Sequence, residues 1–250
     1  GGELALGYSD NLNLDSELDV TKTGGVELGG DFILGMDIYA NKKVTVTPSV
    51  NHYFSNEQKT GGYSTSGTIT QLRVKNKYNK TRSLVLKGGV ESVETYDSPY
   101  LSKLNLQLGH IHSEKKSRLN YQYKYQSISE EVVSANYLAG SAHYLSGSYS
   151  IYGQSITTRL GLSYTSKNLN DSATTASSYS GVRPSLSFVY KGENNKKLRV
   201  GVGINLKSYK KKDVGENEKR KDTLIIVDLE SSKKIGKYVE LFFGYSHAKN

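Results

Sequence analysis

The sequence contains no cysteine and no tryptophan, and it has only three prolines and one methionine in 250 residues. Without cysteine, neither a disulfide framework nor a thiolate metal site can form. No apolar run approaches the roughly 20 residues that a membrane-spanning helix needs, and 224–227 is typical of the longest runs present. The sequence therefore excludes an α-helical membrane protein and any cysteine-based site.

Basic residues, glycine and tyrosine are abundant instead. The chain has 33 lysines and arginines against 24 acidic residues, a net charge of +9, with 25 glycines and 20 tyrosines. A basic balance favours an anionic partner, which could be nucleic acid, lipopolysaccharide or an anionic solute. The basic residues are spread over the whole chain without a nucleic-acid-binding motif, so nucleic acid is not expected as a partner.

Strict alternation of polar and apolar residues dominates the chain, as in 103–108, 118–126 and 199–207. A period of two residues predicts β-strands, and no helical pattern with caps interrupts it. Most of the expected strands are about 10–16 residues long, whereas strands of soluble proteins usually have about 5–6. The expected strands are 3–12, 25–40, 43–55, 63–78, 82–95, 101–113, 117–128, 136–151, 155–167, 180–192, 197–210, 220–233 and 237–248.

The connections between these strands alternate between short and long. Short turns are expected at positions such as 41–42, 79–81 and 114–116, and longer polar loops at positions such as 129–135 and 168–179. Short turns at one rim and long loops at the other are typical of outer-membrane barrels. A strand that crosses a bilayer at a tilt needs about 9–11 residues, which these strands provide.

The fold class predicted for 1–250 is therefore all-β, as a single closed antiparallel transmembrane β-barrel with up-and-down meander topology. About 13 strands are visible, and 14 are expected in the complete barrel, because single-chain bacterial barrels usually have an even strand count. The last strand, 237–248, is expected to rise to the long-loop rim, which would leave a final strand outside this sequence. A soluble β-structure such as a sandwich or a β-helix is the alternative.

The alternation assigns one face of each strand to lipid and the other to a wet lumen. The lipid face is expected to include Leu104, Leu106, Leu108, Val200 and Val202. A lumen basic wall is predicted on the middle strands, from Arg73, Lys75, Lys87, Lys103, Arg118, Lys124, Arg159, Arg183, Arg199 and Lys207. A lumen acidic wall is predicted on the first and last strands, from Glu27, Asp31, Asp37, Asp228, Glu230 and Glu240.

Tyrosines near the predicted strand ends, among them Tyr39, Tyr53, Tyr78 and Tyr209, suit aromatic girdles at the two membrane surfaces. The alternative explanation for these tyrosines is that tyrosine has a high propensity for β-strands.

His110 and His112 share one face and could bind a metal, but no third ligand is evident, so rim histidines are the favoured interpretation. The lysines and arginine of 210–212 and 219–221 could bind lipopolysaccharide phosphates or form a solvated charge run.

The segments 4–14 (LALGYSDNLNL) and 239–250 (VELFFGYSHAKN) carry a family resemblance. The first resembles the opening strand and loop, and the second the next-to-last strand and loop, of porin-like barrels that follow periplasmic repeat domains in bacterial export proteins. Those families include surface-lipoprotein assembly modifiers and exopolysaccharide exporters. The resemblance implies a bacterial outer-membrane location and an export or conduit role, and it identifies no catalytic residue. Such barrels usually end in a strand with a terminal aromatic residue, whereas this chain ends at Asn250.

The function expected from the sequence is a passive outer-membrane conduit, a porin-like pore or the membrane part of an exporter, with a preference for anions. The alternative is a plugged barrel whose surface loops bind a partner or anchor an assembly. No Gly-x-Ser-x-Gly motif or phosphate-binding loop is present, so neither an enzyme nor a cofactor is expected. Outer-membrane lipid, lipopolysaccharide and a periplasmic or surface protein are the expected partners.

Overall fold

The computed structural model describes residues 2–9, 25–57, 64–95, 98–130, 139–170, 178–192, 196–212, 218–235 and 239–249. All of its regular structure is β-strand, and no helix among these residues is long and apolar enough to cross a membrane. The strands are β1 (Gly2–Ser9), β2 (Gly25–Gly35), β3 (Tyr39–Ala40), β4 (Val44–Glu57), β5 (Ser64–Lys77), β6 (Arg82–Thr95), β7 (Ser98–Ser113), β8 (Ser117–Glu130), β9 (Gly140–Tyr152), β10 (Ile156–Leu169), β11 (Tyr179–Lys191), β12 (Lys196–Tyr209), β13 (Lys221–Ile235) and β14 (Val239–Lys249).

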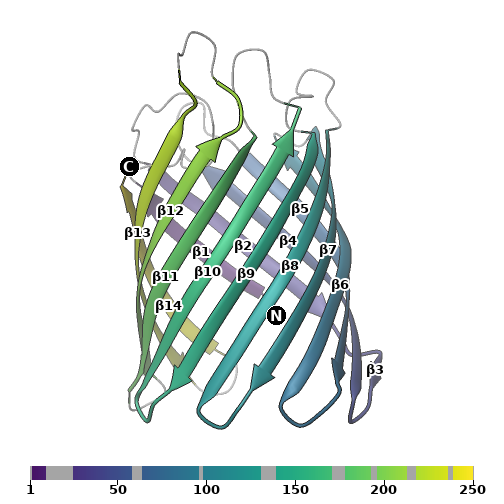
Figure 1. The fold of residues 1–250 in the computed structure, drawn as a ribbon, viewed down its shortest axis with the longest axis vertical. Coiled ribbons are helices and arrows are strands. Elements are labelled where there is room, and N and C mark those ends of the chain that lie inside the picture. The colour runs from purple at the N-terminus through teal and green to yellow at the C-terminus, as the bar shows by residue number, and fades with distance from the viewer. Residues whose placement is uncertain are drawn as a thin grey trace.

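These strands form one antiparallel meander, as the alternation predicted. In the described part of the chain, each strand pairs with the next in the order β1-β2-β4-β5 and onward to β14, and the short β3 pairs with β4. The sheet curls, so that β1, β2 and β4 lie behind β8 to β11 in Figure 1. No pairing of β1 with β14 is found among the described residues. The closed barrel and its complete strand count therefore stay predictions.

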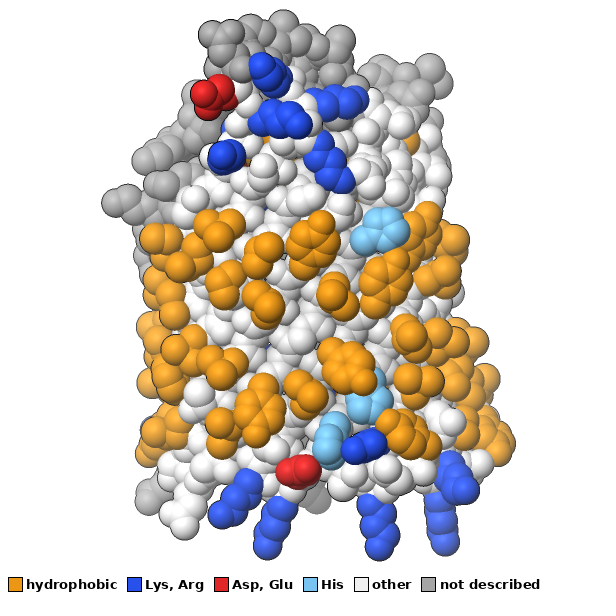
Figure 2. Space-filling view, in the orientation of Figure 1, with side chains coloured by type: hydrophobic (Ala, Val, Ile, Leu, Met, Phe, Trp, Pro, Cys, Tyr) orange, Lys and Arg blue, Asp and Glu red, His pale blue; other side chains and the backbone are white. Residues whose placement is uncertain are grey.

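The outer face of the curled sheet is apolar. Leu162 is 58% exposed and Leu145 is 55% exposed, although both belong to the middle of long strands. Figure 2 shows hydrophobic side chains in a broad band around the visible face, with lysines and arginines above and below it. The predicted lipid-facing residues Leu104, Leu106, Leu108, Val200 and Val202 all belong to this exposed set.

The opposite face, which we call the inner face, is mostly polar. The backbone registers connect its members from strand to strand: Arg73 lies opposite Lys87, and Lys87 lies opposite Gln107. Gln107 in turn lies opposite Lys124. The buried apolar residues in the described part of the chain are few, namely Val85, Val93, Ile128, Ala142 and Tyr209. The sheet thus encloses no apolar core of the kind that holds a soluble β-sandwich together.

The structure corrects the strand predicted at 25–40. It is interrupted after Gly35, and Tyr39 resumes the pairing opposite Val46, whereas Gly35 lies opposite Ser49. Four residues on one side therefore match three on the other, as in a bulge. The extra residue reverses the alternation, so Tyr39 lies on the outer face with Val46 and not on the inner face that its spacing predicted.

The strand predicted at 101–113 begins earlier in the structure. Strand β7 begins at Ser98 and pairs antiparallel with β6 across a register shift between Val93 and Glu94. The predicted strand residues 10–12 and 136–138 lie outside the described residues.

Substitution of Gly140 tests how much the stability of the sheet depends on a close approach between two backbones. Its φ is +150°, and a Cβ there would collide with the carbonyl oxygen of Asn168 on β10. We expect Gly140→Ala to lower the free energy of unfolding by about 1–3 kcal/mol, measured by denaturant unfolding in detergent with circular dichroism. Gly147→Ala in the same strand is the control, because a Cβ there meets nothing within 4 Å. Equal stability of the two variants would contradict this account.

Candidate functional site

The candidate site is the inner face, because polar and charged side chains converge there from neighbouring strands. All ten residues of the predicted basic wall occupy inner-face positions of β5 to β8 and β10 to β12. The registers show this directly, with Arg118 opposite Ser150 and Ser150 opposite Arg159. Arg159 in turn lies opposite Ser187 on β11. The grouping that the alternation predicted is therefore present as geometry.

One half of the inner face, on β4 to β9, is covered by long side chains that bond to one another. Glu91 is its centre: the Tyr53 hydroxyl donates to Glu91 Oε1 at 3.0 Å, and Lys103 Nζ lies 3.0 Å from the same oxygen. The side chains of Lys103 and Glu91 are only 22% and 12% exposed. This ion pair is therefore shielded from solvent. Removal of the Glu91 carboxylate would leave the Lys103 ammonium without its ion-pair partner.

A chain of amides extends this network. Gln107 Nε2 donates to Gln122 Oε1 at 2.8 Å, and Gln126 Nε2 donates to Asn105 Oδ1 at 2.9 Å. The Tyr144 hydroxyl donates to Gln126 Oε1 at 3.2 Å. The ammonium of Lys124 lies 5.4 Å from the centre of the Tyr144 ring, within cation–π range. These contacts fix the long side chains against the wall.

Another part of the inner face, on β9 to β13, is rich in glycine and serine. A Cβ on Gly161 would lie only 2.5 Å from Ser185 Oγ, whereas one on Gly201 would lie in ordinary contact, 3.5 Å from Ser187 Cβ. A Cβ on Gly203 would lie 3.4 Å from Arg183 Nε. The small residues leave a cavity of about 270 Å³. Its lining includes Arg159, Arg183, Arg199, Asp228 and the serines 146, 148, 163, 185 and 187.

The three cavity arginines have different surroundings. Arg199 Nη1 donates to Glu230 Oε1 at 2.8 Å, so its charge is offset by a neighbour on β13. Arg159 Nη2 donates to the hydroxyl of Ser148 at 3.2 Å, a neutral partner. The side chains of Arg159 and Arg183 are exposed toward the cavity that they line.

The predicted acidic wall is placed only in part. Asp228 borders the cavity and Glu230 pairs with Arg199, so both lie among bases. Asp37 accepts a hydrogen bond from Thr47 Oγ1 at 2.5 Å. The side chains of Glu27, Asp31 and Glu240 lie outside the described residues.

Sequence reasoning also missed three acids of the inner face, Glu91, Glu130 and Asp222. Glu91 lies among the bases of the middle strands, and Asp222 lies 3.2 Å from Arg220 Nε. Glu91 occupies the inner-face register of β6, opposite Lys103, so the alternation could have found it.

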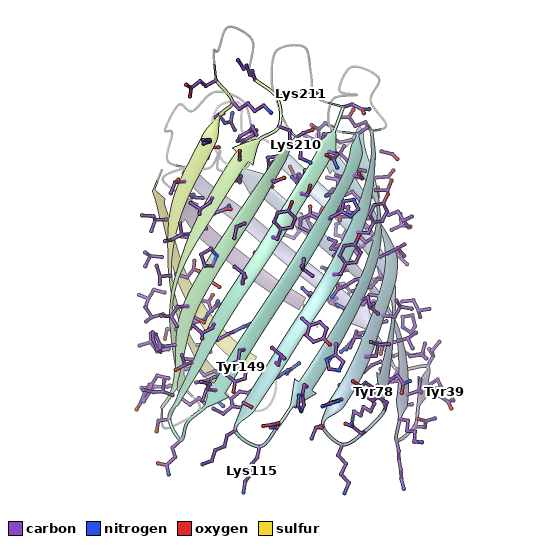
Figure 3. All side chains as sticks on the ribbon, viewed as in Figure 1. Tyr39, Tyr78, Lys115, Tyr149, Lys210 and Lys211 are labelled. Carbon is purple, nitrogen blue, oxygen red and sulfur yellow. The ribbon has the colours of Figure 1, made fainter. Side chains whose placement is uncertain are left out.

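Aromatic and basic residues mark the two ends of the outer face. Figure 3 shows Tyr39, Tyr78 and Tyr149 toward the short-turn end, with Lys115 beyond them, and Lys210 and Lys211 at the opposite end. The predicted girdle is wrong for Tyr53 and Tyr209, which lie on the inner face: Tyr53 bonds to Glu91, and Tyr209 is buried with Arg220 stacked on its ring at 3.8 Å.

His110, His112 and His143 belong to this outer surface. His110 stacks on Tyr121 with ring centres 4.8 Å apart, and His143 Nδ1 lies 2.7 Å from the Tyr123 hydroxyl. His112 Nε2 lies 3.5 Å from Glu114. The described residues hold no group of three or more histidine or acidic side chains that could bind a metal ion.

Lys210, in the basic cluster at 210–212, bonds to the hydroxyl of Ser166 at 3.0 Å and to the side-chain oxygen of Asn168. It thus reaches across β11 to β10 at the long-loop end.

Models of known protein families do not match the chain, and curated proteins do not match it either. Among solved structures it is similar to one described as "Crystal structure of Acinetobacter baumannii OccAB4", with a TM-score of 0.41 and 9% sequence identity. The likeness covers 99% of this chain and 96% of that chain. A likeness at this level carries no argument about function.

The Glu91 network predicts a measurable ranking of stabilities. We expect Glu91→Gln to lower the free energy of unfolding by about 1–3 kcal/mol, because it removes the carboxylate that forms an ion pair with the shielded Lys103. Tyr53→Phe removes one hydrogen bond and should cost about 0.5–1.5 kcal/mol. Glu114→Gln, at a side chain that is 62% exposed, is the control and should change little. Denaturant unfolding in detergent measures all three, and a Glu114 effect equal to that of Glu91 would refute the ranking.

Proposed function

We propose that this chain forms a bacterial outer-membrane β-barrel that acts as a passive conduit with a preference for anions. One observation carries the proposal: the long strands expose large apolar side chains on the outside and gather polar and charged ones on the inside. This order is the reverse of a soluble protein and suits a wall between lipid and a water-filled lumen.

The size of the apolar band supports a membrane as its surroundings. Soluble monomers rarely expose an apolar patch larger than a few hundred Å², whereas here the band extends across the whole visible face in Figure 2. Strands β4 to β13 have 13–16 residues. That length exceeds the 9–11 residues or so that a tilted strand needs to cross a bilayer.

Closure of the sheet is part of the proposal. Lipid offers no hydrogen bonds, so each unpaired backbone group at a sheet edge would cost several kcal/mol in the bilayer. The free edges of β1 and β14 must therefore be satisfied, either by each other or by a further strand. A closed barrel with an even number of strands is the arrangement we favour.

The anion preference follows from the charges on the inner face. Its described acids are Asp37, Glu91, Glu130, Asp222, Asp228 and Glu230, of which Glu91, Asp222 and Glu230 each lie beside a base. The ten predicted basic residues lie on the same face and outnumber these acids. A narrow aqueous path with walls of one sign concentrates ions of the opposite sign. The proposal includes no catalytic step and no cofactor.

Lipid and lipopolysaccharide are the partners that we propose for the outer surface. Lysines at both ends of the apolar band lie where headgroup phosphates would be (Figures 2 and 3). A role in export with a periplasmic or surface partner rests on the sequence resemblance, and it is the second candidate if the bore proves to be plugged.

Paired arginine substitutions test which face meets lipid. Leu106→Arg places a charge on the outer face at mid-strand, and it should oppose membrane insertion by about 2–4 kcal/mol near the midplane. Gln107→Arg, the next residue along β7, places the same charge on the inner face and should insert almost normally. Folding yield into lipid vesicles measures both, and equal insertion of the two variants would contradict the assignment of faces.

Ion selectivity tests the conduit itself. In a planar bilayer with a potassium chloride gradient, we expect a steady conductance whose reversal potential shifts toward the chloride equilibrium potential. Arg73→Gln with Lys87→Gln should reduce that shift, because both charges lie on the inner face. Lys115→Gln with Lys116→Gln, in an exposed turn, is the matched control and should change it less. Cation selectivity would refute the anion preference, and a silent bilayer would favour the plugged barrel.

A further inference from the structure

The cavity on β9 to β13 is part of the inner face, and its lining is also suited to binding a ligand. Around the cavity the inner positions of β9 to β12 are mostly glycine and serine, and β10, β11 and β12 each add one arginine. The small residues leave the surface recessed there. The other half of the inner face has long side chains at the same level. The recess contains Arg159 on β10 and Arg183 on β11.

The charge of the recess is positive. Arg199 is offset by Glu230, and Asp228 is the one carboxylate among the described lining residues. Arg159 and Arg183 add two exposed guanidinium groups on neighbouring strands against that one carboxylate. Guanidinium groups bind carboxylate and phosphate through two parallel hydrogen bonds, which a point charge such as lysine does not provide. The recess is therefore suited to a compact oxyanion.

The rest of the lining is suited to hydroxyl groups. Five serines line the cavity together with the amides of Asn120 and Gln122. Hydroxyls and amides both donate and accept hydrogen bonds, so they can pair with ligand hydroxyls in either direction. The volume of about 270 Å³ lies just below the range of roughly 300–1,000 Å³ for drug-sized ligands, which restricts the ligand to a small molecule.

We propose that this cavity binds a small polyhydroxylated oxyanion, a sugar acid or a sugar phosphate, with Arg159 and Arg183 on its charged group and the serines and amides on its hydroxyls. The inference rests on the proposed function in one respect, namely that the inner face is open to water. It adds a saturable site to the general preference for anions, and chloride is too small to occupy both parts of that site.

Equilibrium binding to the full chain in detergent tests the proposal without any need for conductance. Isothermal titration calorimetry would compare gluconate, glucose 6-phosphate, glucose and potassium chloride. We expect saturable binding of gluconate, glucose 6-phosphate or both, and no saturable binding of glucose or chloride. Gluconate and glucose 6-phosphate separate the carboxylate from the phosphate as the recognised group, and binding of either one supports the site.

Three variants distinguish binding in the cavity from the general attraction of anions to the positive charges of the inner face. Arg159→Gln with Arg183→Gln should weaken binding about tenfold or more, because hydrogen bonds to charged groups are the stronger kind. Arg73→Gln with Lys87→Gln removes two positive charges outside the cavity and should weaken it less than about threefold. Ser185→Leu keeps every charge but fills the recess, and it should also weaken binding about tenfold; circular dichroism would verify that each variant is folded.

Two results would overturn the proposal. The first is the absence of saturable binding by both anions, and the second is an equal loss of affinity in the two charge-removing double variants. With either result, the reversal-potential measurement can still support the anion-preferring conduit, because it does not depend on the binding site. Cation selectivity with intact gluconate binding would refute the anion preference of the conduit and leave the site in place.

Discussion

Backbone hydrogen bonding between neighbouring strands is the interaction on which the rest of this structure depends. The ladders extend over most of each strand, for example from Ile156 opposite Tyr190 to Ser166 opposite Ser180. Because the ladders satisfy the backbone, the sheet does not need a packed apolar core to hold its strands in register. Side chains on its two faces are then free to differ in polarity, apolar on the outer face and mostly polar on the inner face.

Much of this fold could be predicted from the sequence, because alternation in strands of this length is a strong signal. The outer positions Leu104, Leu106 and Leu108 follow from it directly. Prediction failed where one extra residue shifts the phase, as it does before Tyr39. It also failed for Tyr53 and Tyr209, since nearness to a strand end does not say which face a tyrosine occupies.

The candidate site was less accessible to sequence reasoning, since it depends on contacts between strands. Alternation placed the basic residues on one face, but the pairing of Glu91 with Lys103 requires the register of β6 against β7. The prediction of one acidic and one basic wall was incomplete, because neighbouring strands bring positive and negative side chains together. Arg199 on β12 and Glu230 on β13 are an example. The recess did have a signal in the sequence, the glycines and serines at inner positions from Ser146 to Gly203.

In the proposed conduit, the crowded part and the recessed part of the inner face would place the wider side of the lumen beside β9 to β13. On the recessed side its width is set by side chains such as Ser163 and Ser185, which take no part in the backbone ladder through their hydroxyls. A change in the bulk of these residues alters the aperture while the strand pairing that supports the wall stays the same. In such a wall, side-chain atoms of the recess determine the permeability and backbone hydrogen bonds determine the stability. Either property is therefore free to change during evolution without the other.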